Sequence, residues 1–270
     1  MCSTCGCGSG ENGITLTKIG ENHHTHFHTD GHSHSHSHHH HDHHHSHDHH
    51  DHHHSHEANV VELERDILQK NQLSAEKNRG FFEALNIFAI NLVSSPGSGK
   101  TTLLEKTISD LKNEIEFSVI EGDQQTTNDA ERIFALQIPV IQINTGKGCH
   151  LDSEMIAKSL KELKPKPNSV LMIENVGNLV CPAMFDLGEN QRVVIVSVTE
   201  GEDKPLKYPD MFYTSNICII NKIDLLPHLK FDVEKLKENA KKVNPNIRCF
   251  EVSAISGEGM ENWYEFLKTR

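Results

Sequence analysis

The chain has 270 residues, of which 36% are hydrophobic, and a formal net charge of −12 at pH 7. The acidic balance and the absence of a basic stripe argue against nucleic acid as a main partner, and no run approaches the ~18 apolar residues of a membrane span. The start MCSTCGC lacks the basic and apolar parts of a signal peptide. We therefore expect a cytoplasmic protein whose seven cysteines are thiols or metal ligands rather than disulfides.

Residues 1–58 form the first predicted region. Of the 23 histidines, 21 lie between His23 and His56. Its large aliphatic or aromatic residues are limited to Ile14, Leu16, Ile19 and Phe27. So little apolar area cannot offset the entropy of the chain, which predicts a disordered metal-binding region. Residues 59–270 suffice for one α/β domain.

Metal ligands are concentrated in this region. Cys2, Cys5 and Cys7 form a C-x-x-C-x-C cluster, and three thiolates within six residues can hold one ion with only local ordering. With a fourth ligand, such a donor set suits square-planar Ni²⁺ or tetrahedral Zn²⁺; redox-active or incidental thiols are the alternative. The histidine tract predicts capacity for Ni, Cu or Zn rather than one defined site. Ser and Asp interrupt the tract, which distinguishes it from an expression tag.

The order of the remaining elements indicates the fold class. Apolar residues at helical spacing predict one or two lead-in helices over 60–85. Short apolar runs predict strands over 87–94, 117–120, 140–143, 170–173, 192–198, 217–221 and 248–252. Helices are predicted over 101–113, 127–136, 152–163, 232–243 and 260–268. This alternation predicts a mainly parallel sheet flanked by helices on both faces, with ligands at the carboxyl ends of the strands.

A phosphate-binding motif follows the first predicted strand of the domain. A Gly-rich turn leads into Lys-Thr at the start of a helix, which is the P-loop arrangement. Lys100 is expected to reach the β- and γ-phosphates, and the Thr101 hydroxyl to ligate Mg²⁺. Ser94 stands where the usual pattern has Gly, and a plain Gly/Ser turn is the alternative. The residues expected to contact the nucleotide are Ser95, Pro96, Gly97, Ser98, Gly99, Lys100, Thr101 and Thr102.

A second motif, Asn221-Lys222-Ile223-Asp224, follows the predicted strand 217–221. The Asp224 carboxylate can accept hydrogen bonds from N1–H and the 2-amino group of guanine, which adenine does not offer. Ser253 and Ala254, after the next strand, are expected to support the base. An ordinary surface turn is the alternative if residues 221–224 are taken alone. The P-loop followed by this second motif favours GTP.

Two carboxylates at predicted strand ends can complete a magnesium site. Asp123 follows the strand 117–120, and Glu174 follows the strand 170–173. Either is expected to hold Mg²⁺, directly or through water, or to orient the attacking water. The alternative is that one of them only caps the following segment.

A second group of metal ligands is expected within the domain. Cys149 and His150 precede the predicted helix 152–163, and Cys181 lies in a loop after the neighbouring strand. Both segments leave the sheet at the nucleotide end, so these ligands can converge, and a second subunit could complete the shell. A buried Cys beside a surface His is the alternative.

With these motifs in view, the chain resembles the HypB family of nickel-insertion GTPases. The resemblance rests on CSTCGC, the His-rich segment, NLVSSPGSGKTTLL, EGDQQT, NTGKGCHLD, ENVGNLVCP and NKID. It implies a P-loop GTPase that forms a nucleotide-linked homodimer, with an interface metal site using Cys149, His150 and Cys181. It also implies a HypA-like nickel/zinc protein and the precursor of the hydrogenase large subunit as partners.

These observations predict a GTP-hydrolysing nickel metallochaperone for [NiFe]-hydrogenase that uses GTP, Mg²⁺, Ni²⁺ and Zn²⁺. Two alternatives stay open. A related GTPase of urease maturation can also carry a His-rich tail, although the CSTCGC start and the NLVSSPGSGKT segment favour hydrogenase. A nickel storage or detoxification protein would explain the tail, but it would not need intact P-loop and NKID motifs.

Overall fold

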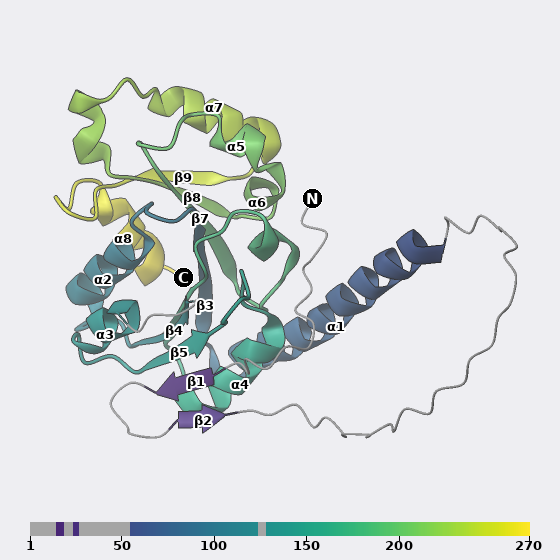
Figure 1. Ribbon diagram of the computed structural model, residues 1–270. Coiled ribbons are helices and arrows are strands. Elements are labelled where there is room, and N and C mark those ends of the chain that lie inside the picture. The colour runs from purple at the N-terminus through teal and green to yellow at the C-terminus, as the bar shows by residue number, and fades with distance from the viewer. Residues whose placement is uncertain (1–14, 19–23, 27–54, 124–127) are drawn as a thin grey trace, which may run out of the picture.

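The computed structural model describes residues 15–18, 24–26, 55–123 and 128–270. These residues form a nine-stranded sheet in the order β2-β1-β5-β4-β6-β3-β7-β8-β9 (Figure 1). The strands are β1 (Thr15–Lys18), β2 (His24–His26), β3 (Phe88–Ser94), β4 (Phe117–Asp123), β5 (Val140–Asn144), β6 (Val170–Glu174), β7 (Gln191–Ser197), β8 (Ile217–Asn221) and β9 (Arg248–Glu251). The seven strands from β5 to β9 in this order are parallel.

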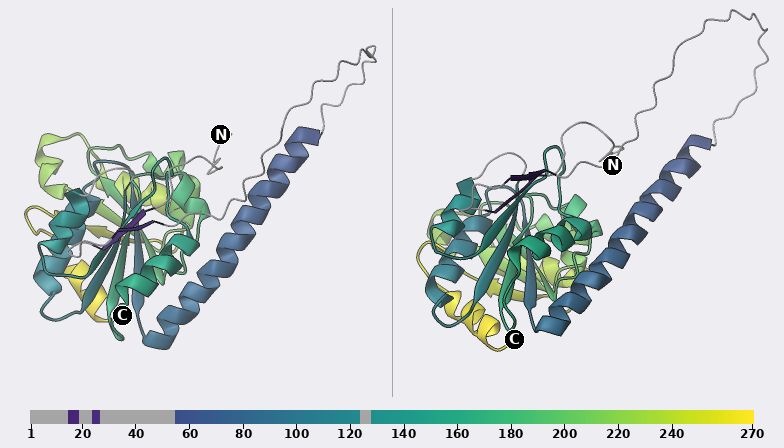
Figure 2. Two further views of the ribbon diagram at one scale, coloured as in Figure 1. Left: turned by 60° about the horizontal axis from the view of Figure 1, so that its bottom comes forward. Right: turned by 90° about the horizontal axis from the view of Figure 1, so that it is seen from below.

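Helices cover both faces of the sheet, which confirms the predicted fold class (Figures 1 and 2). The helices are α1 (Ser55–Leu85), α2 (Lys100–Leu111), α3 (Asn128–Phe134), α4 (Ser153–Leu163), α5 (Lys204–Lys207), α6 (Pro209–Tyr213), α7 (Val233–Val243) and α8 (Met260–Lys268), with 3₁₀ turns η1 (Cys181–Met184) and η2 (Ile223–His228). The four short elements α5, α6, η1 and η2 have too few residues to show a helical period in the sequence.

Alternation along the strands divides the core between the two faces. In β3, Ile90 and Leu92 pack with α2, α3 and α8, where Trp263 also donates a hydrogen bond to Thr107. Ala89 faces the opposite side, where side chains of α1 and α4 cover it. Towards β8, the same side is covered by α6 and α7. Because both faces are buried, the strands are continuous apolar runs, as expected for parallel sheets.

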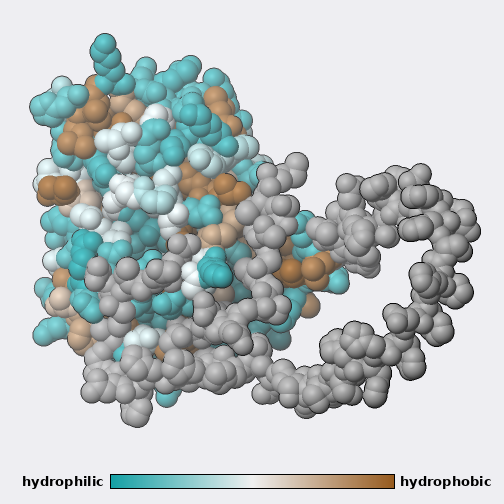
Figure 3. Space-filling model, viewed as in Figure 1, coloured by the Kyte–Doolittle hydropathy of each residue, from teal (hydrophilic) through white to brown (hydrophobic). Residues whose placement is uncertain are grey.

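The lead-in region is one helix rather than two. The later turns of α1 pack against α4, while its N-terminal part extends beyond the body of the domain (Figure 2). Large apolar side chains remain exposed along α1, among them Leu63 at 61% and Leu73 at 63%. The visible part of this helix correspondingly shows apolar patches among polar residues (Figure 3).

The short strands β1 and β2 lie within residues 1–58, a region for which the sequence predicts disorder. Strand β1 pairs antiparallel with β5 and with β2. Leu16 is only 4% exposed and packs among the residues of the α1 and α4 side. One buried leucine in a four-residue strand gives no periodic signal, so the sequence alone does not reveal it. Covering the edge of β5 also protects it from pairing with other chains. The boundary at residue 58 stays a prediction.

None of the helices in the described parts of the chain combines the length and apolar character needed to cross a bilayer.

Candidate functional site

The P-loop connects β3 to α2 at the carboxyl edge of the sheet, as the sequence predicts. Gly97 and Gly99 have φ angles of +77° and +91°, which favour glycine because a side chain would strain the backbone. At Gly99 space is also short, since a Cβ atom would lie 2.6 Å from Nδ2 of Asn221. That amide donates a 3.0 Å hydrogen bond to the Ser98 carbonyl oxygen, so β8 directly holds the loop.

Lys100 and Thr101 both contact one carboxylate oxygen. The distance from Lys100 Nζ to Glu174 Oε1 is 2.7 Å, and the Thr101 hydroxyl donates to the same atom at 2.6 Å. Glu174 is fully buried at the end of β6. Its other oxygen, Oε2, has no hydrogen-bond partner among the described residues, and neither has the hydroxyl of Ser98. Buried polar atoms without partners are costly, so the arrangement has spare capacity for a ligand.

This donor set fits Mg²⁺. A hydroxyl oxygen and carboxylate oxygens are hard ligands of the kind that this ion prefers. Asp123 and Glu174 supply such oxygens at the ends of the adjoining strands β4 and β6, and Thr101 supplies one from the first turn of α2. Asp123 ends β4, and its backbone oxygen accepts a hydrogen bond from the backbone N–H of Thr145, 2.9 Å away.

The Asn-Lys-Ile-Asp segment is built into the loop beside the phosphate site. The Asn221 side-chain oxygen accepts hydrogen bonds from the backbone N–H groups of Lys222 and Ala254, at 2.8 and 3.2 Å. Lys222 Nζ donates to the Gly97 carbonyl oxygen at 2.7 Å. These contacts place the segment after β8, the Ser253-Ala254 turn and the P-loop within one connected group. Asp224 accepts a 2.5 Å hydrogen bond from the Ser253 hydroxyl, which orients its carboxylate.

Two charged residues near the P-loop were not predicted. Lys204 of α5 bonds the Ser95 hydroxyl at 3.1 Å and Glu200 at 3.0 Å. Glu121 of β4 pairs in register with Glu174 of β6 and is only 2% exposed. A glutamate that directly follows the apolar residues Val119 and Ile120 is the signal that could have revealed it.

Burial and the nearby carboxylates Glu174 and Asp123 raise the pKa of Glu121 to about 9. Desolvation is the largest cause, because a carboxylate loses its hydration in this part of the core. Lys100 opposes the shift. Glu121 is therefore protonated at neutral pH, which places an uncharged hydrogen-bonding group next to the charged Lys100–Glu174 pair.

Replacing Glu121 with glutamine is expected to flatten the pH dependence of stability. With a native pKa of about 9 against an ordinary 4.5, the folded chain keeps a proton that the unfolded chain releases. The free energy of unfolding therefore falls, through this group, as the pH rises between these two values. The neutral glutamine lacks this term, so the variant should be the more stable protein at about pH 8. Urea unfolding across this pH range measures the difference, and parallel profiles for both proteins would contradict it.

The structure brings Cys149, His150 and Cys181 together. One ligand atom from each of the three lies within 4.8 Å of the others. Cys149 Sγ is 3.7 Å from His150 Nδ1, and the His150 ring stacks on Phe185 with ring centroids 3.9 Å apart. Burial lowers the pKa of His150, which favours the neutral imidazole that a metal requires. The group can offer two sulfurs and one nitrogen to Ni²⁺ or Zn²⁺.

Local turns place the two segments that carry these ligands. After β5, the Thr145 carbonyl accepts from the Gly148 N–H at 2.8 Å, and the Thr145 hydroxyl donates to the Gly148 carbonyl at 2.8 Å. Asp152 then caps α4 by accepting from the Met155 N–H. Cys181 opens η1 with Pro182 behind it. The three predicted ligands at Cys2, Cys5 and Cys7 lie outside the described residues.

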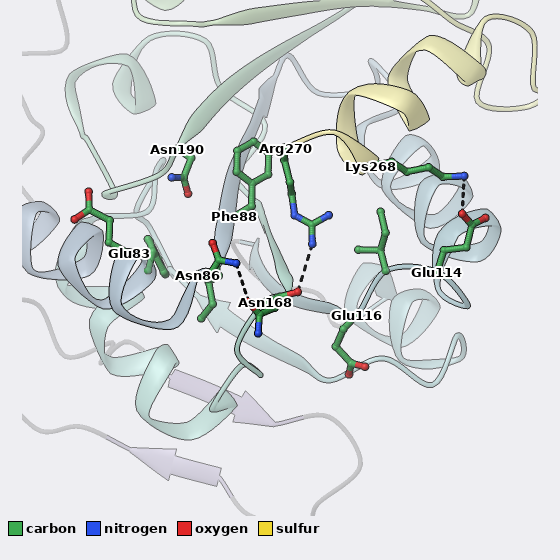
Figure 4. A pocket seen from close by; sticks show the side chains of 12 residues that line it. Glu83, Asn86, Phe88, Glu114, Glu116, Asn168, Asn190, Lys268 and Arg270 are labelled. Carbon is green, nitrogen blue, oxygen red and sulfur yellow. Dashed lines mark hydrogen bonds and ion pairs between the residues drawn. The ribbon is translucent and has the colours of Figure 1, made fainter.

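A separate pocket lies at the opposite end of the sheet (Figure 4). Its volume is about 740 Å³, and its lining comes from the amino ends of β3, β4, β6 and β7 together with α1 and α8. Arg270 donates to the Asn168 carbonyl oxygen there, and Lys268 pairs with Glu114. None of the predicted site residues lines this pocket. We therefore do not assign it to the nucleotide, although it is large.

Comparison with known proteins agrees with this geometry. Residues 88–251 match the family model of the CobW/HypB/UreG nucleotide-binding domain. Over 209 residues the chain is 58% identical to the hydrogenase maturation factor HypB of Rhizobium leguminosarum bv. viciae. The aligned region covers 77% of this chain and 70% of that protein.

Two solved structures have a similar fold. The HypB of Archaeoglobus fulgidus aligns with a TM-score of 0.69 at 42% identity, over 74% of this chain and 98% of that one. The HypB of Helicobacter pylori in complex with nickel aligns with a TM-score of 0.69 at 39% identity, over 74% of this chain and 94% of that one.

Proposed function

The chain belongs to the CobW/HypB/UreG family, within its HypB hydrogenase maturation factors, and on that premise we propose that it is a GTP-hydrolysing nickel metallochaperone. The observation that carries this proposal is the cluster of Cys149, His150 and Cys181, which follows β5 and β6 at the same edge of the sheet as the phosphate site. A nickel-bound relative of the same fold supports nickel as the cargo. Delivery to [NiFe]-hydrogenase follows from the maturation role in the relatives' names.

For hydrolysis we assign a role to each residue of the phosphate site. The P-loop from Ser95 to Thr102 cradles the phosphates, and Lys100 balances their charge. When bound, Mg²⁺ would neutralise charge on the phosphates, held by Thr101 with Asp123 and Glu174. Asp123 or Glu174 orients the attacking water. GTP hydrolysis itself, as distinct from nucleotide binding, is part of the proposal.

Guanine selectivity is proposed to depend on Asp224. Asp224→Asn replaces an acceptor that faces the guanine N1–H and 2-amino groups, so GTP affinity should fall at least about 100-fold. Xanthosine triphosphate should bind this variant better than GTP does, because its 2-oxo group can accept from the new amide. Nucleotide titration with both bases measures the exchange. Asp232→Asn, which keeps the acceptor that caps α7, is the matched control and should behave like the natural protein. Unchanged GTP affinity in Asp224→Asn would exclude the assigned base site.

The proposed nickel site is completed between two copies of the chain. The described part of one chain supplies three ligands, whereas Ni²⁺ and Zn²⁺ bound to sulfur and nitrogen usually take four. Two apolar side chains near Cys181 are exposed, Val180 at 56% and Met184 at 50%. Such a rim around an incomplete metal shell favours a second copy of the same chain, in a GTP-linked homodimer. Zn²⁺ is proposed as a second metal that the same donors accept.

The remaining proposals concern partners and the N-terminal region. We propose a HypA-like nickel/zinc accessory protein and the precursor of the hydrogenase large subunit as partners, and Cys2, Cys5 and Cys7 with the histidine tract as a nickel-binding store. Cytoplasmic location remains a prediction from the sequence.

Gene deletion followed by complementation tests the cellular role. Cells lacking the gene should lose hydrogenase activity at low nickel, regain part of it with added nickel, and keep urease activity. A Cys149→Ala copy should fail to restore hydrogenase, and a Cys249→Ala copy should restore it. Loss of urease with intact hydrogenase would favour the urease-type alternative. Loss of nickel tolerance alone would favour storage.

A further inference from the structure

A buried asparagine links the phosphate site to one metal-bearing loop. Asn175 follows Glu174 directly and is 1% exposed. Its side-chain oxygen accepts hydrogen bonds from the backbone N–H groups of Leu151, at 3.1 Å, and of Val176, at 3.0 Å. Leu151 follows His150 in the sequence. A displacement of Asn175 therefore acts on the peptide unit that immediately follows a proposed nickel ligand.

The same asparagine also starts a connection to the second metal-bearing loop. Its amide donates to Asn91 Oδ1 at 3.2 Å, and Asn91 in turn donates to Glu189 Oε1 at 3.0 Å. Glu189 pairs with the buried Arg192 at 2.9 Å. The connection is made entirely of buried groups in direct contact.

Arg192 completes this connection at η1. It donates to the carbonyl oxygen of Ala183, inside η1, at 3.2 Å and to that of Phe185, just after it, at 2.8 Å. The Phe185 ring stacks on His150. The contacts thus close a ring that holds the Cys149–His150 loop and the Cys181 turn against each other. Buried polar networks of this kind are costly to break in part, because each lost bond leaves an unsatisfied group.

The phosphate site acts on the start of this ring. Lys100 and Thr101 both bond Glu174 Oε1, and they are also the two groups that a P-loop offers to the β- and γ-phosphates and to Mg²⁺. Bound nucleotide and Glu174 therefore compete for the Lys100 ammonium group, and the γ-phosphate strengthens that competition. The Thr101 oxygen would turn to Mg²⁺, which Glu174 would help to hold. Any shift of Glu174 is transmitted to Asn175 through one peptide bond.

We propose that Asn175 is the positioning residue that couples the phosphate side of the nucleotide site to the Cys149–His150–Cys181 cluster. This inference rests on the proposed function, since it presumes that nucleotide state changes nickel affinity. Asn175 sets the separation of the two metal-bearing segments through Leu151 and Asn91, and it touches neither the nucleotide nor the metal itself.

The test compares nickel affinity in two nucleotide states. The full chain is used with Cys2, Cys5 and Cys7 replaced by serine, so that thiolate-to-nickel charge-transfer absorption reports the cluster rather than the N-terminal cysteines. A chelator buffers free Ni²⁺, so binding by the histidine tract does not distort the titration. The measured quantity is the ratio of the nickel Kd with GDP to that with a non-hydrolysable GTP analogue.

In this background the ratio should differ from one by at least about fivefold. Asn175→Ala should bring the ratio to within about twofold of one, while nickel still binds and GDP affinity stays within about threefold. Asn239→Ala is the matched control, because Asn239 is also a buried asparagine with an amide-to-carbonyl bond, but on α7. It should leave the ratio unchanged.

The outcomes distinguish a failure of the role inferred for Asn175 from a failure of the proposed function. A ratio of one before any change at Asn175 would overturn both nucleotide gating and this inference. A clear ratio that survives in a folded Asn175→Ala protein would overturn the inference alone. Amide exchange at Leu151 tests the same contact without substitution: its protection should differ at least about tenfold between the two nucleotide states. Equal protection would also overturn the inference, even if the alanine variant does not fold.

Discussion

Lys100→Ala is expected to lower GTP turnover at least about 100-fold, the loss typical of removing one preorganised charge from a transition state. Lys100 is the first residue of α2. Its ammonium group is held at the P-loop by the 2.7 Å contact with Glu174. The same change leaves the fully buried Glu174 without its cation, so we also expect lower stability without nucleotide. Single-turnover hydrolysis at saturating GTP separates the chemical step from weakened binding.

Lys106→Ala is the matched control for this prediction. Lys106 lies on the same helix, and its ion pair with Asp110 is partly exposed and away from the loop. This variant should hydrolyse GTP at the rate of the natural chain. If a folded Lys100→Ala protein does the same, the P-loop assignment is wrong.

Cys149→Ala and Cys181→Ala are each expected to weaken nickel binding by the domain at least about 100-fold. Loss of a residue that only orients a metal ligand already costs 10–100-fold in metal affinity, so loss of a ligand should cost no less. Among the described residues the cluster consists of three donor atoms within 4.8 Å of one another, so it has no further member to replace the missing sulfur. The experiment uses the background with serine at Cys2, Cys5 and Cys7 and buffered free Ni²⁺.

Cys249→Ala is the matched control for these two variants. Cys249 is a partly buried thiol on β9, next to Cys218 on β8, and is not part of the cluster. It should leave both the charge-transfer band and the nickel Kd unchanged. If nickel affinity is unchanged in either Cys149→Ala or Cys181→Ala, these cysteines are structural residues and not nickel ligands.

Much of the fold could be predicted because its strands are buried on both faces. Runs such as Ile217–Asn221 show no alternation, and a parallel sheet explains this directly. The P-loop and the segment at Asn221 were recognisable for a different reason: phosphate binding and guanine recognition need particular residue types at fixed spacing. The family resemblance that these motifs suggested is confirmed.

The features that escaped prediction depend on contacts between distant segments. The position of Glu121 beside an apolar run was a local signal, but its raised pKa comes from burial and from Glu174 on the neighbouring strand. Asn175 is one of many asparagines in the sequence, and its role depends on a bond to Leu151, 24 positions earlier. Strand β1 pairs with β5, and its buried residue Leu16 packs in the core on the α1 and α4 side. No local pattern encodes such pairings, so only the folded structure shows them.

The proposed function requires that bound GTP changes the nickel affinity of the Cys149–His150–Cys181 cluster. The most direct measurement is the nickel Kd of this cluster with GDP and with a non-hydrolysable GTP analogue. We predict a difference of at least about fivefold, which linkage requires to appear equally as a nickel-dependent change in nucleotide affinity. Identical nickel Kd values in the two states would show that the nucleotide and metal sites share one domain without acting on each other.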